Sequence, residues 1–281
     1  MAGQVTVCAL FYGDHAALAQ RCLGSLEKSF QEGKKHIADI RLGLNAVCPG
    51  VRDYVHGWAE DIAIQCGIPV TVYQPERNVF KYPLMRAMFH QPLPTRELGD
   101  YVMWFDDDAY LEEKFSWARA MNHMEAHDMI GHVYYWYIRG QQWAWVQQQP
   151  WYNPAVGPPK IFRGKPVFQF AQGSWWVIRS SILRKYDWPI KALRHNGGDS
   201  MLGELFRQQR LRLGRFVERV RVNADERGRD SRAPRRGFRE PPLGQNLAES
   251  LRVDPAYHQF IMAVRSYTAQ GWSNTTLSGA A

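Results

Sequence analysis

The first 105 residues alternate between two hydrophobic periods, and this alternation limits the chain to a small set of folds. Apolar runs of strand length occupy residues 5–12, 37–47, 70–73 and 101–105. Between these runs, apolar residues recur every three or four positions, as on the buried face of a helix, in 19–30, 51–66 and 82–89. Strands that alternate with helices in this way build a mostly parallel sheet with helices on both faces. The sequence therefore predicts an α/β fold.

The second half of the chain is less regular. Strand patterns occupy 129–138 and 167–178, a helix pattern lies at 200–209, and an extended stretch covers 211–222. We interpret residues 141–160 as an irregular, aromatic-rich loop, 223–246 as a flexible segment, and 255–267 as a closing helix. These patterns predict one domain over 1–222, followed by an arginine-rich segment and a C-terminal helix in 223–281.

Composition supports a single large hydrophobic core and argues against a membrane-spanning or secreted chain. Of 281 residues, 45% are hydrophobic, yet no apolar run reaches the roughly 18 residues that cross a bilayer. The N-terminus has no basic segment followed by an apolar signal region. The four cysteines form no C-x-x-C pair, so we expect reduced thiols in the core. We expect a soluble, cytoplasmic protein.

The net charge of +8 is concentrated in one segment. Residues 207–239 contain twelve arginines, no lysine and four acidic residues. The net charge of this segment is therefore +8, which equals the net charge of the whole chain. Arginine binds phosphates in a bidentate manner and stacks on bases or aromatic rings. This arginine tract therefore indicates an anionic partner. The alternative is a solvated loop whose arginines pair with nearby acids.

An acidic cluster marks the first candidate site. The apolar strand at 101–105 ends at Asp106, Asp107 and Asp108, at the carboxyl end where open α/β sheets bind their ligands. Adjacent carboxylates repel one another unless a cation neutralises them, and Mg²⁺ or Mn²⁺ would do so. Alternate residues of an extended segment face the same side, so Asp106 and Asp108 are the expected metal ligands. A solvated acidic turn or a helix cap is the alternative.

This arrangement resembles GT-A-fold glycosyltransferases, most nearly family 2, over about residues 5–222. The resemblance rests on the acidic cluster, on Phe11-Tyr12-Gly13-Asp14, on Arg77-Asn78, and on the segments Gln172–Trp176 and Gly197–Asp199. Two motifs depart from the family pattern. Arg77-Asn78-Val79 occupies the position of the family's usual Asn-x-Gly motif, and Gly197-Gly198-Asp199 occupies the position of the commoner Glu-Asp motif.

The resemblance implies a role for each half of the domain. Residues 1–110 would bind a nucleotide sugar, with UDP-sugars as the expected donors, through Phe11, Tyr12, Asp14, Asn45, Arg77, Asn78, Lys81, Arg86 and Asp106. Residues 111–222 would bind the acceptor, and the implied contacts are Gly173, Trp175, Trp176, Gly198, Arg235 and Arg236. Neighbouring strand residues face opposite sides, so only one of the two tryptophans would line the pocket. His195 is a further candidate metal ligand, although a loop histidine is its commoner role.

Asp199 is the candidate catalytic residue. An inverting transfer needs a carboxylate that takes the proton of the acceptor hydroxyl on the face opposite the leaving diphosphate. Two glycines precede Asp199 and leave room for a substrate. The alternative is that Asp199 caps the helix that begins near Ser200.

The acceptor is the least determined part of this hypothesis. The arginine tract would suit a DNA acceptor, as in phage-type glycosyltransferases that modify 5-hydroxymethylated pyrimidines, and the location would then be the host cytoplasm. The tract would equally suit anionic lipid headgroups, a phosphorylated glycan or the donor diphosphate itself. Three alternatives stay open. The protein could be a soluble glycosyltransferase acting on a glycan or small molecule, a metal-dependent nucleotidyltransferase, or a non-catalytic nucleic-acid-binding protein.

Overall fold

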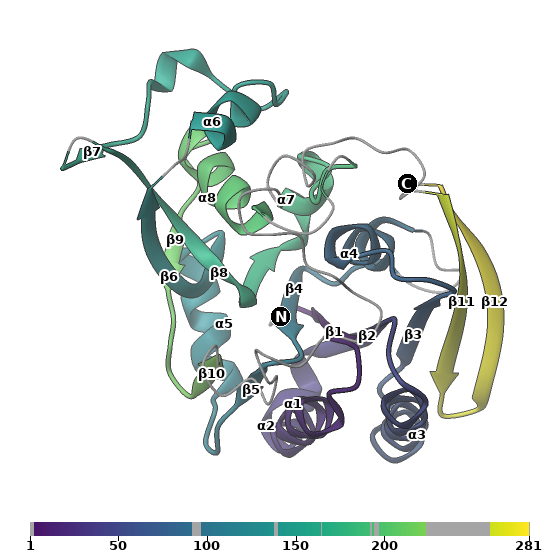
Figure 1. Ribbon diagram of the computed structural model, residues 1–281. Coiled ribbons are helices and arrows are strands. Elements are labelled where there is room, and N and C mark those ends of the chain that lie inside the picture. The colour runs from purple at the N-terminus through teal and green to yellow at the C-terminus, as the bar shows by residue number, and fades with distance from the viewer. Residues whose placement is uncertain are drawn as a thin grey trace.

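A computed structural model describes residues 3–91, 97–137, 140–163, 165–191, 193, 197–222 and 259–280. Its centre is one large twisted sheet with helices on both faces (Figure 1). The strands follow the order β12-β11-β3-β2-β1-β4-β8-β6-β9, with the short strand β7 paired to β8. A separate two-stranded sheet pairs β10 with β5.

The strands have the following bounds: β1 (Val5–Tyr12), β2 (Ile37–Asn45), β3 (Val70–Pro75), β4 (Tyr101–Asp106), β5 (Ala109–Leu111), β6 (Met129–Tyr137), β7 (Ile161–Phe162), β8 (Lys165–Arg179), β9 (Leu213–Arg215), β10 (Val220–Val222), β11 (Gln259–Thr268) and β12 (Gly271–Ala280). Neighbouring strands from β3 through β2 and β1 to β4 are parallel, as the alternation of strands and helices predicts. The pairs β4–β8, β8–β6, β3–β11 and β11–β12 are antiparallel.

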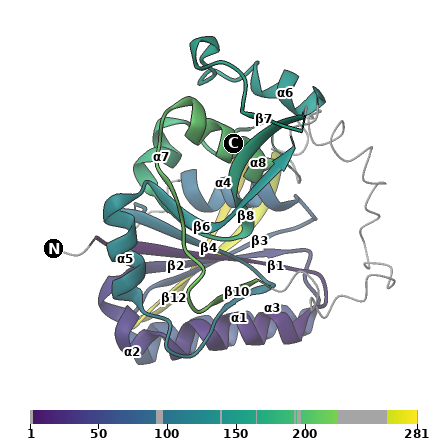
Figure 2. The ribbon, with the colours of Figure 1, turned by 90° about the vertical axis from the view of Figure 1, so that its left-hand side faces the viewer.

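The helices are α1 (Ala16–Lys28), α2 (Phe30–Gly33), α3 (Pro49–Cys66), α4 (Lys81–His90), α5 (Trp117–Ala126), α6 (Gly140–Val146), α7 (Ser180–Lys185) and α8 (Gly198–Gln208), with 3₁₀ turns η1 (Lys34–His36) and η2 (Pro154–Val156). Figure 2 shows α1 and α3 on one face of the sheet and α4, α7 and α8 on the other. Each face therefore has its own core. One core packs α1, α3 and α5 against the sheet, and the other packs α4, α7 and α8.

The predicted helix at 255–267 is wrong, because residues from Gln259 onward form β11. Phe260, Met262 and Val264 are buried, whereas Ile261 between them is 50% exposed, which is the period of a strand. This strand pairs with β3, so the described C-terminal residues extend the same sheet as residues 5–215. The helical reading failed because a short apolar run fits both periods.

The predicted loop at 141–160 is also partly wrong, because it contains α6 and η2. Helix α6 packs Trp143, Trp145 and Val146 against the core on the α4 side of the sheet. This packing stabilises the helix, which is too short to be stable by itself. The segment predicted to be flexible, 223–246, lies outside the described residues. All four cysteines are free thiols; Cys8 and Cys22 are buried, whereas Cys48 and Cys66 are partly exposed. In the described part of the chain, no helix is both long and apolar enough to cross a membrane.

Candidate functional site

The candidate site lies where the parallel strands end together. Tyr12 pairs with Asn45 at the ends of β1 and β2, and Asp106 ends the neighbouring strand β4. The loops that follow these strands are joined by hydrogen bonds. Cys48 N donates to Gly13 O at 2.9 Å, which fixes the loop after β2 against the loop after β1.

Two asparagines determine where α4 begins. Asn45 Nδ2 donates to Asn78 Oδ1 at 2.9 Å, and Asn45 Oδ1 accepts from Val79 N at 3.0 Å. Asn78 Oδ1 also accepts from Phe80 N at 2.9 Å. Phe80 has a φ of 66°, a backbone conformation that a phenylalanine rarely adopts without such support. The asparagines predicted to bind the donor thus hold the β3–α4 loop, which places Lys81 at the first position of the helix.

Lys81 connects the two halves of the site. Its Nζ donates to Asp106 Oδ2 at 2.7 Å and to Gly173 O, on β8, at 2.8 Å. The other oxygen of Asp106 accepts from Trp104 Nε1 at 2.9 Å. The predicted donor side and the predicted acceptor side therefore meet at a partly buried ion pair.

Asp199 lies at the same point, in the first turn of α8. A Cβ atom placed on Gly173 would be 3.3 Å from Lys81 Nζ and 3.8 Å from Asp199 Oδ2. Asp199 Oδ1 accepts from Ser200 N at 2.8 Å, and Gly197, not Asp199, is the N-cap of the helix. The structure thus brings Lys81, Asp106, Gly173 and Asp199 together.

Burial raises the pKa of the Asp199 carboxyl above its ordinary value, although the Ser200 N–H and the charge of Lys81 oppose this shift. A carboxylate with a raised pKa holds a proton more strongly and is a better general base near neutral pH. The geometry and the electrostatics of Asp199 therefore fit the role that the sequence predicts for it.

Tyr82 is a site residue that the sequence reasoning missed, because its helical spacing indicated only a core position. Its ring and hydroxyl lie directly against Gly198, and the backbone at Gly198 and Asp199 lowers the pKa of the hydroxyl, as nearby N–H groups do. These groups open α8 and have no partner within the helix. Burial, followed by the charge of Asp199, raises the pKa of Tyr82 well above its usual value, so the side chain is a neutral phenol. Tyr82 thus fixes the backbone that carries Asp199.

We predict that Gly198→Ala destabilises the protein by about 1–3 kcal/mol, because the added methyl group would overlap the ring and hydroxyl of Tyr82. Chemical denaturation measures this change in the free energy of unfolding. Gly57→Ala in α3 is the matched control, since nothing lies within 4 Å of its Cβ position. It should leave stability unchanged or raise it slightly. Equal stability of Gly198→Ala and the wild type would contradict the close contact.

Asp107 and Asp108 do not continue the strand alternation expected of them, because they form a turn between β4 and β5. Both are buried, and Asp108 is only 2% exposed. Their charges, with burial as the larger cause, raise the pKa of the Cys22 thiol in α1.

Among the described residues, no group of three His, Cys, Asp or Glu side chains could hold a metal ion alone. Mg²⁺ and similar ions need only one or two protein carboxylates when substrate phosphates supply the remaining oxygens. Asp106 and Asp108 alone therefore supply too few ligands to hold such an ion without a diphosphate. His195 lies outside the described residues.

Four of the side chains predicted to contact ligands are buried in the structure. Trp175 and Trp176 are 0% and 2% exposed, and Trp176 stacks on Trp104 with ring centroids 5.9 Å apart. Both rings are buried because both faces of the sheet are covered by helices at this point. Phe11 lies in the core beneath α1. The guanidinium of Arg86 is buried and donates to Pro189 O and to Asp187, so it holds the loop after α7.

The remaining predicted contacts are more accessible. Asp14 and Arg77 are exposed, and Tyr12 is half-buried, all in loops at the carboxyl edge. Three arginines of the tract pair with local acids, namely Arg207 with Glu204, Arg212 with Asp128 and Arg221 with Glu112. Arg210, Arg215 and Arg219 are exposed, and no ion pair joins them to another described residue. Arg235 and Arg236 lie outside the described residues.

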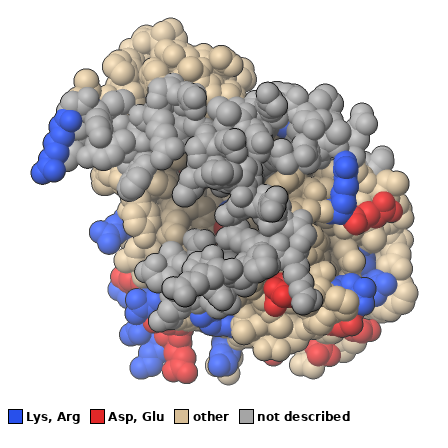
Figure 3. Space-filling model, in the orientation of Figure 1, with Lys and Arg blue, Asp and Glu red and all other residues tan. Residues whose placement is uncertain are grey.

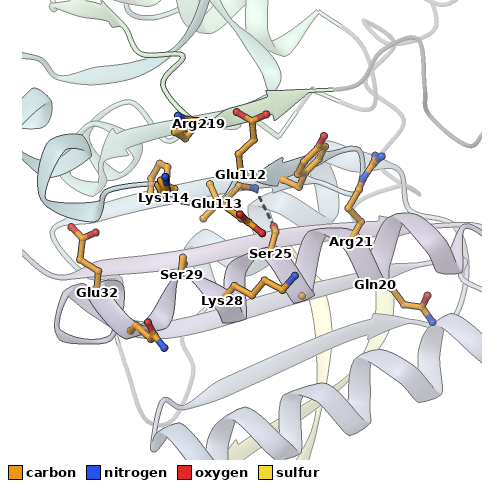
Figure 4. A pocket seen from close by; sticks show the side chains of 15 residues that line it. Gln20, Arg21, Ser25, Lys28, Ser29, Glu32, Glu112, Glu113, Lys114 and Arg219 are labelled. Carbon is orange, nitrogen blue, oxygen red and sulfur yellow. Dashed lines mark hydrogen bonds between the residues drawn. The ribbon is translucent and has the colours of Figure 1, made fainter.

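A separate cavity of about 770 Å³ lies between α1 and the segment that follows β5 (Figure 4). Ser25 in its wall accepts a hydrogen bond from Leu111 N at 3.0 Å. Its charged lining is mixed, with Arg21, Lys28 and Arg219 close to Glu112 and Glu113. None of Lys81, Asp106 and Asp199 lines it, so this cavity is distinct from the candidate site.

The sequence matches no protein-family model and no curated protein. Solved structures are similar in fold. The mannosyltransferase PcManGT from Pyrobaculum calidifontis, in complex with GDP-Man and Mn²⁺, is 13% identical with a TM-score of 0.53, and the match covers 78% of this chain and 56% of that one. GalNAc-T7 with UDP, GalNAc and Mn²⁺ is 12% identical with a TM-score of 0.52, over 75% of this chain and 42% of that one. This chain matches about half the length of these proteins. The similarity shows that the chain has the GT-A fold.

Proposed function

We propose that this protein is a glycosyltransferase that moves a sugar from a nucleotide-sugar donor to a hydroxyl group. The observation that carries the proposal is the convergence of Lys81, Asp106 and Asp199 at the carboxyl edge of a GT-A sheet. Two solved proteins of this fold hold a sugar nucleotide, or UDP with a sugar, and Mn²⁺. A UDP-sugar is our first candidate donor.

The proposed reaction inverts the anomeric centre. The acceptor oxygen forms a bond to the anomeric carbon, the bond from that carbon to the diphosphate oxygen breaks, and Asp199 takes the proton of the acceptor hydroxyl. The ammonium of Lys81, which bonds to Asp106, is proposed to stabilise the negative charge that develops on the leaving diphosphate. Tyr82 and Gly198 keep the base in place.

The proposed cofactor is Mn²⁺ or Mg²⁺, held by Asp108 with Asp106. When bound, this ion would stabilise charge on the diphosphate oxygens. Arg77 and Asp14, which are exposed at the same edge, are proposed to contact the nucleotide.

We predict that the protein binds Mn²⁺ tightly only together with a nucleoside diphosphate, because the described residues offer no complete metal site. Electron paramagnetic resonance of free Mn²⁺ should show little loss of signal with protein alone and a clear loss after UDP is added. Asp108→Asn should remove this loss. Stoichiometric binding of Mn²⁺ without nucleotide would contradict the prediction.

The proposed acceptor is a 5-hydroxymethylated pyrimidine in DNA. The support is that the arginine tract carries the whole net charge, and that Arg210, Arg215 and Arg219 are exposed. The rival acceptors are a glycan and a small molecule.

Turnover with a panel of nucleotide sugars tests the reaction class. Release of nucleoside diphosphate from a UDP- or GDP-sugar supports a glycosyltransferase. Release of pyrophosphate from a nucleoside triphosphate in the presence of a sugar phosphate would instead identify a nucleotidyltransferase. If the protein binds DNA but releases neither nucleoside diphosphate nor pyrophosphate, it is a non-catalytic nucleic-acid-binding protein.

A further inference from the structure

The middle of the chain contains a long segment without acidic residues. The chain has 27 Asp and Glu among 281 residues, which is roughly one in ten, yet none occurs between Asp128 and Asp187. The same 58 residues contain seven Lys and Arg and fourteen aromatic residues. A surface built from this segment carries no negative charge of its own, so it does not repel an anionic partner.

Much of this segment forms an arm that projects from the sheet. We define the arm as the described residues of 133–173, which comprise the outer part of β6, α6, η2, β7 and the first part of β8. Figures 1 and 2 show that it extends beyond α8, away from α1 and α3. Among the residues that Figure 3 colours by type, no acidic one lies over the upper part of the face drawn. Lys160 and Arg163 are exposed near the tip.

The arm exposes aromatic rings that a folded core would normally bury. Tyr134 is 48% exposed and Tyr135 is 69% exposed, on neighbouring positions of β6. Tyr134 pairs across the strands with Phe170, and their ring centroids lie 6.4 Å apart. Phe170 in turn stacks with Phe168 at 5.3 Å. These ring contacts support Tyr134 from one side and leave part of its surface accessible.

The arm is attached directly to the candidate site. Gly173, whose carbonyl accepts from Lys81, follows Phe170 by three residues on β8, about 10 Å along a strand. Helix α8, which begins with Gly198 and Asp199, rests on the arm at Gly203. A side chain there would overlap Gln169 O and Phe170. A ligand that stacks on the arm is therefore held close to Asp199.

We infer that the arm is the surface that binds the acceptor strand of a nucleic acid. Neighbouring strand residues face opposite sides, so its bases would stack on Tyr134 on one face of β6 and on Tyr135 on the other, and its phosphates would lie near Lys160 and Arg163. Single-stranded nucleic acid is recognised by this combination of aromatic rings and positive charge. A neutral glycan would also stack on tyrosine, but it would not require the absence of acids from 58 successive residues. The inference rests on the nucleic-acid acceptor proposed above and assigns that role to the arm instead of Trp175 and Trp176.

Fluorescence anisotropy of a labelled single-stranded DNA of about 12 nucleotides tests the inference with the full-length protein. The double variant Tyr134→Ala/Tyr135→Ala should bind the DNA at least tenfold more weakly, because each base–ring contact contributes to affinity. The double variant Tyr134→Phe/Tyr135→Phe should bind like the wild type, since it keeps both rings. Trp272→Ala on β12 is the matched control, because this ring is 54% exposed at the far edge of the sheet.

The results separate this inference from the proposed activity. Equal binding by the wild type and the Tyr134→Ala/Tyr135→Ala protein would overturn the arm's role, and so would wild-type binding to a neutral oligosaccharide but not to DNA. Circular dichroism shows whether the variant is folded; if it is not, Tyr135→Ala alone provides the test, since most of that side chain faces solvent. DNA binding that depends on the tyrosines, without any turnover of nucleotide sugars, would support the arm and contradict the glycosyltransferase.

Discussion

Asp199→Asn should lower sugar transfer by about 10²- to 10⁴-fold while raising the stability of the protein at neutral pH. The first effect follows because asparagine cannot take the proton of the acceptor hydroxyl. The second follows because burial raises the pKa of Asp199. The native state then binds a proton more tightly than the unfolded state, so stability decreases as pH rises from the unfolded pKa through the folded pKa. Asparagine avoids this cost because it does not ionise.

Rates measured against pH, together with thermal unfolding at pH 7, test both effects. The wild-type rate should rise with pH as Asp199 loses its proton, and the midpoint of this rise should lie above the ordinary pKa of an aspartate. The Asp199→Asn variant should not show this rise. Asp61→Asn on α3 is the control, because Asp61 is exposed and outside the site. An Asp199→Asn protein that retains wild-type turnover would show that Asp199 is not the base. A lower melting temperature would show that its carboxylate is structural.

Lys81→Met should lower transfer by about 10²- to 10³-fold, because it removes the cation beside Asp106 and the hydrogen bond to Gly173 O. It also leaves the carboxylate of Asp106 partly buried without its ion-pair partner, which should lower stability. The variants Lys81→Met and Asp106→Asn should not be additive, because the two residues act as one pair.

A double-mutant cycle on kcat/KM measures this coupling. Arg52→Met provides a matched control, because Arg52 pairs with Asp53 at 2.8 Å on the exposed surface of α3, where an ion pair contributes little. Additive effects of Lys81→Met and Asp106→Asn would contradict the interpretation that the two residues act as one pair.

The sequence predicted the parallel half of the fold well because periodicity and chain order determine it. The predicted strand at 5–12 has the bounds of β1, and the carboxyl-end rule placed Asp106 at the edge of the sheet. The contacts of Lys81 with Asp106 and Gly173 depend on tertiary packing between residues 25 and 92 positions apart, which no local pattern contains. The sequence indicated these residues separately but not their contact.

The errors have equally physical causes. Trp175 and Trp176 looked like ligand contacts because tryptophan stacks well, but the sequence did not reveal that helices cover both faces of β8. Tyr82 looked like an ordinary core residue, since the role of its hydroxyl depends on α8, more than a hundred residues away. The run that forms β11 fits both periods, and its pairing with β3, from the first half of the chain, is not visible in the local sequence.

Incubation of the protein with UDP-sugars, Mn²⁺ and DNA containing 5-hydroxymethylcytosine or 5-hydroxymethyluracil tests the central claim most directly. Mass spectrometry of the digested nucleosides should show a gain of one sugar with the wild type and none with Asp199→Asn. A sugar added to another acceptor would retain the glycosyltransferase and exclude the DNA acceptor. No transfer to any acceptor, and no nucleoside diphosphate released from any nucleotide sugar, would contradict the account.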